Sequence, residues 1–547
     1  MSKQPNRSTS SSTPPRTHPR QWTDLFLLVL LLAGSFLARV PFREVELIRD
    51  EGEYAYIGQQ ILQGAVPYAD IYNQKTPFVF YFMAITQELF GSSLSAIRLS
   101  TALWGLAATV VIYLLAQTLF GRLAGLWTAA VFSIMTLDEC GVVHSANTEF
   151  FMLFWIALAV YFWVRRFGNT RPIWPLLAGA AAAMAYQTKQ IGAVVLFFLT
   201  IDPLWRWLIG ANAWSSSWRP SLRTIGLALT GALVLTTAVL GYFAWNGALG
   251  AYIECTWMNN WQYVGIRTGN LTSRLVLSDL VRENIKWDIG FWLIGAIALV
   301  IAGIRRKPAA GHTLWLILVG FGVAAISAGE YPQYYIPLIV PLSLGCGLGF
   351  SWAWIWCTTP GRHMIFRIAG WLLILGPWIG PAIHNGSYLL MSQQQFQHVK
   401  QIGTPFDASR EVAAYLAEHS LPGECTIIVG SEPQIYYYAN RKACTRMVFT
   451  YPIVGNYAYA NRLEQELLED VKKHRPRYIA VIKIYKSISE FPFYVDPFLD
   501  RFFDAVAEEY GVEVKLPRPQ TAGTRAPASL NEYVWILRRL DSIDPTH

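Results

Sequence analysis

Apolar stretches of membrane-spanning length recur along most of the first 390 residues. A helix needs about 20 apolar residues to cross a hydrocarbon core of about 30 Å. Stretches near that length lie at residues 23–40, 96–119, 123–137, 149–164, 173–187, 190–209, 224–245, 288–304, 312–328, 334–356 and 364–383. A further run at residues 77–90 is too short to span comfortably, so we expect it to lie in the interface or to re-enter. The sequence therefore predicts a mainly α, polytopic membrane helix bundle with about 11 transmembrane helices and outer juxtamembrane helices.

The distribution of charge agrees with a membrane protein. Charged residues make up 15% of the chain, against about 25% in soluble domains. A net charge of +8 would also fit a nucleic-acid-binding protein, but the basic residues form short clusters between the apolar stretches. With the N-terminus in the cytoplasm, these clusters fall on the cytoplasmic side, as the positive-inside rule requires. We therefore expect no nucleic acid partner, a multi-pass protein of the inner (plasma) membrane, and a C-terminus outside the cytoplasm.

Three regions follow from composition. Residues 1–22 are rich in Ser, Pro and Arg, which predicts a disordered cytoplasmic tail. Residues 23–390 are predicted to form the transmembrane catalytic domain, with a first outer loop at 41–76. Beyond residue 390, strand-length apolar runs at 425–430, 478–485 and 533–539 alternate with helical patterns at 410–420 and 461–473. This alternation predicts a soluble, extracytoplasmic α/β domain over 391–547 with partly parallel strand pairing.

The six cysteines include no CxxC pair, so a thiolate metal site is not expected. Cys346 and Cys357 lie in or near an apolar run, where packing is the usual role of a cysteine. Cys425 and Cys444 share the C-terminal region. They either form a disulfide or remain free thiols, since sequence does not give their separation in space.

The first outer loop concentrates carboxylates near the membrane, where charges are costly and tend to be functional. Asp50, Glu51 and Glu53 fall within four residues. If residues 50–62 are helical, one face is shared by Asp50, Glu53, Tyr54 and Ile57. We expect the apolar part of that face to dock the helix on the membrane. Capping of the helix N-terminus accounts for one or two of these acids, but the following loop, with its Gly, Pro and Tyr residues and Lys75, favours a functional site.

Three further positions are candidates with ordinary alternatives. Lys189 lies between two apolar runs on the outer side, where it either contacts a phosphate or extends to the interface from a helix end. The segment 327–342 groups Glu330, Gln333, Tyr334 and Tyr335 at an outer helix junction, either as a ligand contact or as an aromatic belt. His144 could ligate a metal beside Asp138, Glu139 or Glu149, but a single histidine does not predict a metal site.

Taken together, these motifs resemble a known family. DEGEYAYIGQQILQG at residues 50–64, the Lys75-Thr76-Pro77 motif, a helix opening with Arg98, and the Asn147-Thr148-Glu149 motif are similar to GT-C class glycosyltransferases. The likeness is to the branch that includes protein O-mannosyltransferases and lipid A aminoarabinose transferases (glycosyltransferase family 39-like), and it covers roughly residues 22–350. Two departures leave the particular substrate open: Thr76 stands where Pro is common, and Glu149 stands where Asp is common.

The resemblance implies an inverting transfer of a sugar from a polyprenyl phosphate to an acceptor hydroxyl on the extracytoplasmic face. Asp50 is then the general base or the group that orients the acceptor, and Glu51 and Glu149 shape the same pocket. Lys75 is implied to hold the donor phosphate. The other implied substrate contacts are Lys189, Glu53, Tyr54, Tyr334 and Tyr335.

The partners that follow are a polyprenyl-phosphate sugar and a lipid, glycan or protein acceptor. No cofactor is implied with certainty, and a divalent metal is compatible with the acids present. Neither a Walker loop nor a strand-linked GxGxxG motif occurs, which argues against a nucleotide donor. A membrane transporter and a catalytically silent envelope scaffold remain as alternatives. Transporters tend toward internal repeats and mid-membrane charges, whereas the candidate charges here lie in outer loops.

Overall fold

The computed structural model describes residues 19–137, 146–167, 171–208, 219–262, 279–304, 332–392, 395, 406–454, 458–483, 485–488, 497–517 and 532–542. Within these ranges, seven helices are long and apolar enough to cross a membrane: Trp22–Phe42, Leu94–Phe120, Thr148–Arg165, Leu222–Trp245, Ile285–Ile304, Gln333–Thr358 and Met364–Leu389. Shorter apolar helices lie at Phe78–Phe90, Arg122–Met135 and Gln190–Leu204. The predicted polytopic helical architecture is therefore confirmed. The span predicted at 312–328 and most of the N-terminal tail lie outside the described residues.

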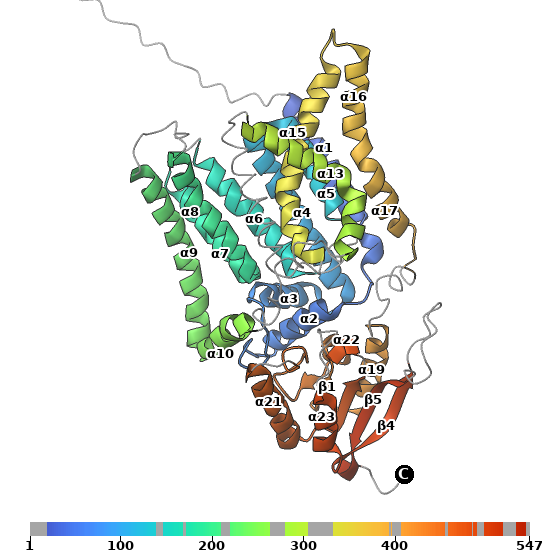
Figure 1. Ribbon diagram of the computed structural model, residues 1–547. Coiled ribbons are helices and arrows are strands. Elements are labelled where there is room, and N and C mark those ends of the chain that lie inside the picture. The colour runs from blue at the N-terminus through green and yellow to red at the C-terminus, as the bar shows by residue number, and fades with distance from the viewer. Residues whose placement is uncertain are drawn as a thin grey trace, which may run out of the picture.

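The long helices form one bundle (Figure 1). Helix α1 (Pro19–Leu37) packs against α4 (Leu94–Phe120) and α5 (Arg122–Met135), and α6 (Thr148–Arg165) packs between α4 and α7 (Ile173–Thr188). The remaining bundle helices are α8 (Ala193–Leu208) and α9 (Arg219–Trp245), which pack on α7, and α13 (Asp279–Ile304), α15 (Ile339–Thr358), α16 (Met364–Leu375) and α17 (Ile379–Leu389). The C-terminal end of α9 is followed by α10 (Leu249–Ile253) and a π-helical turn, η3 (Glu254–Asn259). A 3₁₀ segment, η4 (Pro332–Leu338), leads into α15.

Two helices lie across the end of the bundle, between it and the C-terminal region (Figure 1). They are α2 (Arg49–Leu62), which confirms the helix predicted from residue 50, and α3 (Phe78–Phe90). Two glycines let α2 approach its neighbours closely. A Cβ at Gly52 would lie 2.3 Å from Cβ of Gln434 in the C-terminal region, and one at Gly58 would lie 2.7 Å from Cβ of Met83 in α3.

The expectation that α2 docks on the membrane is wrong. Every residue from Glu51 to Gln60 is buried, because α3 covers one side of the helix and α20 (Gln434–Ala439) covers another. Most of the exposed apolar residues of this pair of helices lie instead on α3, at Ile85, Leu89 and Phe90, and α2 exposes only its last residue, Leu62. Sequence periodicity marks an apolar face but does not say whether lipid or protein covers it.

The C-terminal region builds a small mixed sheet flanked by helices. Its strands are β1 (Cys425–Val429), β2 (Lys442–Ala443), β3 (Tyr478–Ile482), β4 (Tyr510–Pro517) and β5 (Glu532–Arg539), in the order β2-β1-β3-β5-β4. β1 pairs in parallel with β2 and β3, whereas β5 pairs antiparallel with β3 and β4. The other helices of this region are α19 (Phe406–His419), α21 (Ala458–His474), α22 (Tyr485–Ile488) and α23 (Phe498–Val506). The three predicted strands and the partly parallel pairing are confirmed, and the two edge strands, β2 and β4, were not predicted.

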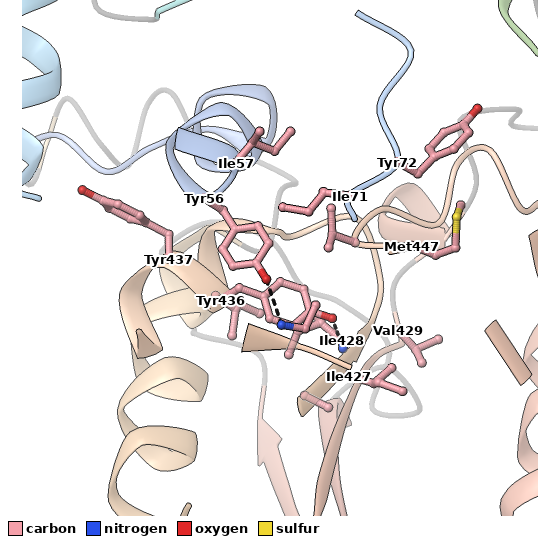
Figure 2. Close-up of a cluster of buried hydrophobic side chains, with 14 of the residues drawn as sticks. Tyr56, Ile57, Ile71, Tyr72, Ile427, Ile428, Val429, Tyr436, Tyr437 and Met447 are labelled. Carbon is pink, nitrogen blue, oxygen red and sulfur yellow. Dashed lines mark hydrogen bonds between the residues drawn. The ribbon is translucent and has the colours of Figure 1, made fainter. Parts of the chain in front are cut away.

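The apolar core of this sheet continues into α2. A single cluster of buried side chains includes Tyr54 and Ile57 of α2, Ile427 and Val429 of β1, and Tyr436 of α20. Figure 2 shows Tyr56 pointing from α2 toward Tyr436 and the sheet across this boundary. A domain boundary was predicted at residue 391. The first outer loop, which precedes this boundary, shares its apolar core with the C-terminal region that follows the boundary.

Candidate functional site

The site is built on the N-terminus of α2. Ile48 precedes the helix in an extended conformation, and its backbone N–H donates to Oε2 of Glu51 at 3.0 Å. This bond places a carboxylate over the otherwise unpaired N–H groups of the first turn. Glu51 therefore does the capping, and Asp50, one residue earlier, is left half-buried.

Glu51 is held inside the protein on all sides. Its side chain is fully buried, and Oε1 accepts hydrogen bonds from the Arg98 guanidinium of α4 and from the backbone N–H of Ala146. Arg98 in turn donates to the backbone carbonyls of Val45 and Glu46. Both Glu51 oxygens thus bond to protein, so the carboxylate fixes α2 against α4 and the segment before α6.

Asp50 and Glu53 lie one helical turn apart and face Lys75 of the following loop. Burial, together with the negative charge of Asp50, raises the pKa of Glu53 from its ordinary value of 4.5 to about 8. The positive charge of Lys75 and the Asn73 side chain act in the opposite direction. At neutral pH Glu53 is therefore mostly protonated.

Lys75 is presented by a tightly bonded loop. Its backbone N–H donates to Oδ1 of Asn73 at 2.7 Å, and its carbonyl accepts from the Tyr68 hydroxyl at 2.8 Å. Burial opposes the charge of Lys75, but Asp50, Glu149 and Glu53 outweigh this effect and raise its pKa. The predicted base candidate Asp50 and the predicted phosphate contact Lys75 thus lie within electrostatic range of each other.

A second cation lies on the other side of Lys75. Glu149, in the first turn of α6, is buried and forms an ion pair with Lys189 at the end of α7. Oε2 of Glu149 also accepts from the Thr148 hydroxyl at 3.0 Å. The Lys189 ammonium lies 4.7 Å from the centre of the Tyr334 ring, a cation–π distance. The structure therefore joins Lys75, Glu149, Lys189 and Tyr334 in one charged cluster.

The two remaining predicted residues differ in surroundings. Tyr54 is fully buried beside Phe80, and its burial, together with the charges of Asp50, Glu53 and Glu149, raises its pKa well above the ordinary value. It belongs to the cluster. Tyr335 is buried among apolar side chains of the bundle core. Glu330 and His144 lie outside the described residues. Within the described ranges, no three His, Cys, Asp or Glu side chains are grouped as metal ligands would be.

Sequence reasoning missed the residues that hold α2 from the C-terminal side. Arg49 donates to the carbonyl of Ser431 at 2.6 Å and pairs with Glu432 at 3.0 Å. The Tyr56 hydroxyl accepts from the backbone N–H of Ala443 at 2.8 Å (Figure 2). These partners are almost 400 residues from α2 in sequence, and no local pattern connects them.

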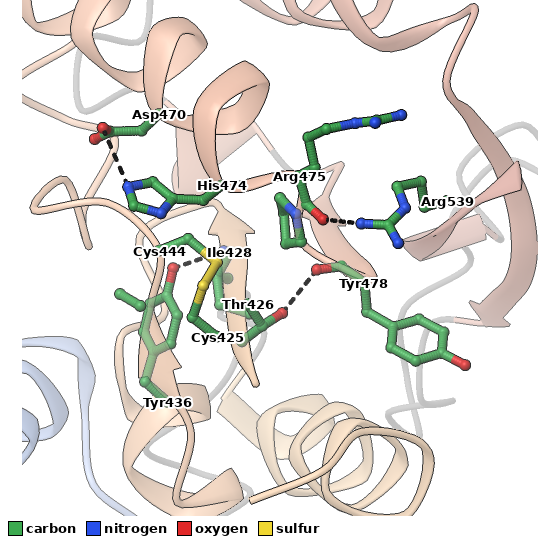
Figure 3. Close-up of a disulfide and its surroundings, with 12 residues drawn as sticks. Cys425, Thr426, Ile428, Tyr436, Cys444, Asp470, His474, Arg475, Tyr478 and Arg539 are labelled. Carbon is green, nitrogen blue, oxygen red and sulfur yellow. Dashed lines mark hydrogen bonds and ion pairs between the residues drawn. A yellow bond between two sulfur atoms is a disulfide. The ribbon is translucent and has the colours of Figure 1, made fainter. Parts of the chain in front are cut away.

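A disulfide lies at this interface. Cys425 and Cys444 are bonded, with their Cα atoms 5.0 Å apart, which resolves the alternative left open by the sequence (Figure 3). The bond ties the start of β1 to the residue after β2, next to the Ala443 N–H that contacts Tyr56. Cys255, Cys346 and Cys357 are buried free thiols.

The helix bundle together with the C-terminal region matches the fold of solved membrane glycosyltransferases. The structure of ArnT from Cupriavidus metallidurans bound to undecaprenyl phosphate aligns with a TM-score of 0.61 at 16% identity, covering 95% of this chain and 98% of that one. The archaeal oligosaccharyltransferase AglB from Archaeoglobus fulgidus aligns with a TM-score of 0.55 at 12% identity, covering 85% and 70%. The chain therefore has the fold of the GT-C class of membrane glycosyltransferases, which confirms the resemblance noted from its motifs.

The amino-acid sequence is also similar to that of known transferases. The family described as dolichyl-phosphate-mannose-protein mannosyltransferase matches residues 74–242. Undecaprenyl phosphate-alpha-4-amino-4-deoxy-L-arabinose arabinosyl transferase 1 of Pseudomonas fluorescens is 26% identical over 350 residues, covering 59% of each chain. The corresponding transferase of Pseudomonas aeruginosa is 26% identical over 340 residues, covering 58% of each. The aligned part is thus less than two thirds of these relatives' length.

Proposed function

We propose that this protein is a glycosyltransferase that uses a polyprenyl-phosphate sugar and transfers the sugar, with inversion, to an acceptor hydroxyl. The observation that carries the proposal is that a half-buried carboxylate, Asp50, lies within electrostatic range of Lys75, beside the Glu149–Lys189 ion pair, at the end of a GT-C membrane bundle. A base next to cations suits a reaction in which a hydroxyl loses its proton while a phosphate leaves. The names of the sequence relatives support a lipid-linked donor.

In the proposed mechanism, the Asp50 carboxylate accepts the proton of the acceptor hydroxyl. The acceptor oxygen bonds to the anomeric carbon from the face opposite the phosphate, and the bond from that carbon to the phosphate oxygen breaks. The polyprenyl phosphate leaves with the bonding electrons, and Lys75 stabilises the added negative charge. Lys189, held in place by its ion pair with Glu149, supplies a second ammonium group beside the leaving phosphate.

The acids divide into two roles. Glu149 orients Lys189, and with it the reacting sugars, at the edge of the site. Glu51 acts as a positioning residue, because both of its oxygens bond to protein groups. Glu53, Tyr54 and Tyr334 complete the substrate contacts of the proposal, whereas Tyr335, which packs in the apolar core of the bundle, is not among them. The mechanism uses the chain's own side chains, and addition of a chelator to the assay tests whether a divalent metal is also required.

The proposed topology has about 11 spans in the inner membrane, with the N-terminus in the cytoplasm. The site and the C-terminal α/β domain then face outward. A lipid-linked sugar is available on that side, whereas nucleotide sugars normally are not. Single cysteines introduced into the exposed loops test this orientation. A membrane-impermeant thiol reagent added to intact cells should label only those on the outer side.

The proposed function is tested with purified protein in proteoliposomes supplied with a panel of polyprenyl-phosphate sugars. Donor consumption by the wild type that is lost in Asp50→Asn supports the transferase. No consumption of any donor by well-folded protein would favour a transporter or a scaffold that kept the fold.

A further inference from the structure

A group of uncharged side chains lies directly beside the charged cluster. Asn73 and Gln74 precede Lys75 in the outer loop, and Gln187 and Gln190 flank Lys189 at the end of α7. Asn259, from the π-helical turn η3, completes this group. We call these five residues the amide cluster: Asn73, Gln74, Gln187, Gln190 and Asn259.

Hydrogen bonds connect the three segments that carry the amide cluster. Gln190 donates to the carbonyl of Gln74 at 2.6 Å, and Asn259 donates to the Tyr72 hydroxyl at 3.1 Å. Gln74 donates to the same hydroxyl at 3.3 Å, and the Tyr252 hydroxyl donates to Oε1 of Gln187 at 3.4 Å. These bonds tie the three segments together, although they come from distant parts of the chain.

Two polar atoms of the amide cluster have no hydrogen-bond partner among the described residues. Nε2 of Gln187 and Oδ1 of Asn259 are both buried without one, and their residues are 2% and 1% exposed. The Asn73 side chain lies against the Glu53 carboxyl. Burial of an unpaired amide is unfavourable, so such groups in a folded protein call for an explanation, and a ligand that pairs with them is one. One donor and one acceptor match sugar hydroxyls, since each hydroxyl both donates and accepts.

The carboxyls at the edges of the amide cluster are balanced by cations. Glu254 of η3 faces Arg446 at 3.5 Å and Arg462 at 3.7 Å, both from the C-terminal region. Glu53 lies beside Asn73 but also faces Lys75. A cationic amino group on the sugar would need a carboxylate that is not already balanced in this way.

We propose that the amide cluster binds the sugar ring of the lipid-linked donor, and that this sugar is a neutral polyhydroxylated ring rather than an amino sugar. The inference rests on the proposed function, because it places the donor phosphate at Lys75. A sugar joined to that phosphate then lies next to Asn73 and Gln74. The relatives named above act on an amino sugar by their names, so the proposal separates this chain from them.

The test measures binding by full-length protein in nanodiscs to three lipids. These are undecaprenyl phosphate, the same lipid carrying glucose or mannose, and the lipid carrying 4-amino-4-deoxyarabinose. The wild type is expected to bind a neutral-sugar donor more tightly than undecaprenyl phosphate. An affinity for neutral sugars no greater than for undecaprenyl phosphate, or a preference for the amino sugar, overturns the proposal.

Substitutions in the amide cluster test whether these side chains contact the sugar. Asn259→Leu and Gln187→Met keep side-chain volume and remove the amide, so the neutral-sugar donor should bind about tenfold more weakly. Undecaprenyl phosphate should bind as before. The matched control is Asn385→Leu on α17, another buried amide with an unpaired oxygen, which should leave both affinities unchanged. An equal loss for both lipids contradicts a sugar contact.

These experiments distinguish a failure of the proposed transferase function from a failure of the proposed sugar site. Binding that depends on a neutral sugar, with no transfer in the assay above, contradicts the transferase but supports the amide cluster as a sugar site. Transfer of an amino sugar supports the transferase and overturns the inference about the neutral ring.

Discussion

Arg49, the residue before the proposed base, forms an ion pair of 3.0 Å with Glu432 of the C-terminal region. Glu432 is fully buried, and its other oxygen accepts from the Ser487 hydroxyl. Burial disfavours the charged guanidinium, but Glu432 and the Tyr451 hydroxyl outweigh this effect and raise the pKa of Arg49. The backbone at Asp50 is thus fixed by residues almost 400 positions further along the chain, which gives the C-terminal region a part in forming the site.

Removal of Glu432 should therefore reduce both stability and activity. Glu432→Ala leaves the Arg49 charge without its main partner and should lower the free energy of unfolding by about 3 kcal/mol. Thermal unfolding in detergent measures the loss. The control is Glu509→Ala, because the Arg475–Glu509 pair is nearly half exposed and should contribute about 0–1 kcal/mol. Equal losses in the two variants would show that the buried pair has no special role.

The neighbouring acids Asp50 and Glu51 should respond differently to loss of charge. Asp50→Asn should lower the rate of transfer by about 10²–10⁴-fold with little change in stability, as expected for a general base. Glu51→Gln should instead lower the free energy of unfolding by about 3 kcal/mol, because Arg98 loses its buried partner. Turnover and thermal unfolding of each variant are compared with those of Asp70→Asn, an exposed acid of the same loop. Near-normal turnover in Asp50→Asn removes it from catalysis.

Lys75 should act on the donor phosphate. Lys75→Ala should weaken binding of undecaprenyl phosphate about 10–100-fold, the range expected for a charge-assisted hydrogen bond. Lys75→Arg keeps the charge and should recover part of the affinity. Direct titration of the lipid into nanodiscs measures both, with Lys442→Ala on the exposed edge of the sheet as the control. An unchanged affinity in Lys75→Ala would contradict the phosphate contact.

The sequence predicted those parts of the fold that depend on local pattern. Apolar stretches predicted the bundle helices, and alternation of short apolar runs with helical patterns predicted β1, β3 and β5. The strand β4 was missed because Glu513 and Lys515 break its apolar character at the edge of the sheet. The burial of α2 was missed because the covering residues, such as Tyr436 and Ala443, are distant in sequence.

In the candidate site, too, some residues could be singled out from the sequence, whereas their pairing depends on how the helices pack. Asp50 and Lys75 could be singled out because charges beside a membrane are costly, and the family resemblance suggested their roles. Glu51 could not be told apart from Asp50 by sequence, because its partner Arg98 is 47 residues away and belongs to another helix. The pairing of Glu149 with Lys189 is likewise a property of how α6 and α7 pack.

The disulfide should stabilise the C-terminal region and, through Ala443, its contact with α2. Replacement of Cys425 and Cys444 together by Ser opens a loop with a sequence separation of 19 residues, which should cost about 3 kcal/mol of unfolding free energy. Wild-type protein treated with a reductant should unfold at the lower temperature of the double variant. The double variant itself should not respond to the reductant. A response of the variant would assign the effect to another thiol.

The protonation of Glu53 should make stability depend on pH. Its pKa is about 8 in the folded protein, chiefly because of burial, against an ordinary value of 4.5. The folded state therefore keeps a proton that the unfolded state releases, so this contribution to stability is fully present below pH 4.5 and is lost as the pH rises through 8. Glu53→Gln resembles the protonated form and should flatten the fall in melting temperature between about pH 4.5 and 8.

The same titration should affect donor binding. Above pH 8 an ionised Glu53 places a second negative charge beside Asp50 and Lys75, which should repel the donor phosphate. The affinity of the wild type for undecaprenyl phosphate should then fall across this range, whereas that of Glu53→Gln should stay constant. Glu88→Gln, an exposed acid on α3, should follow the wild type. If Glu53→Gln keeps the pH dependence of the wild type, another group is responsible and Glu53 does not control the charge at Lys75.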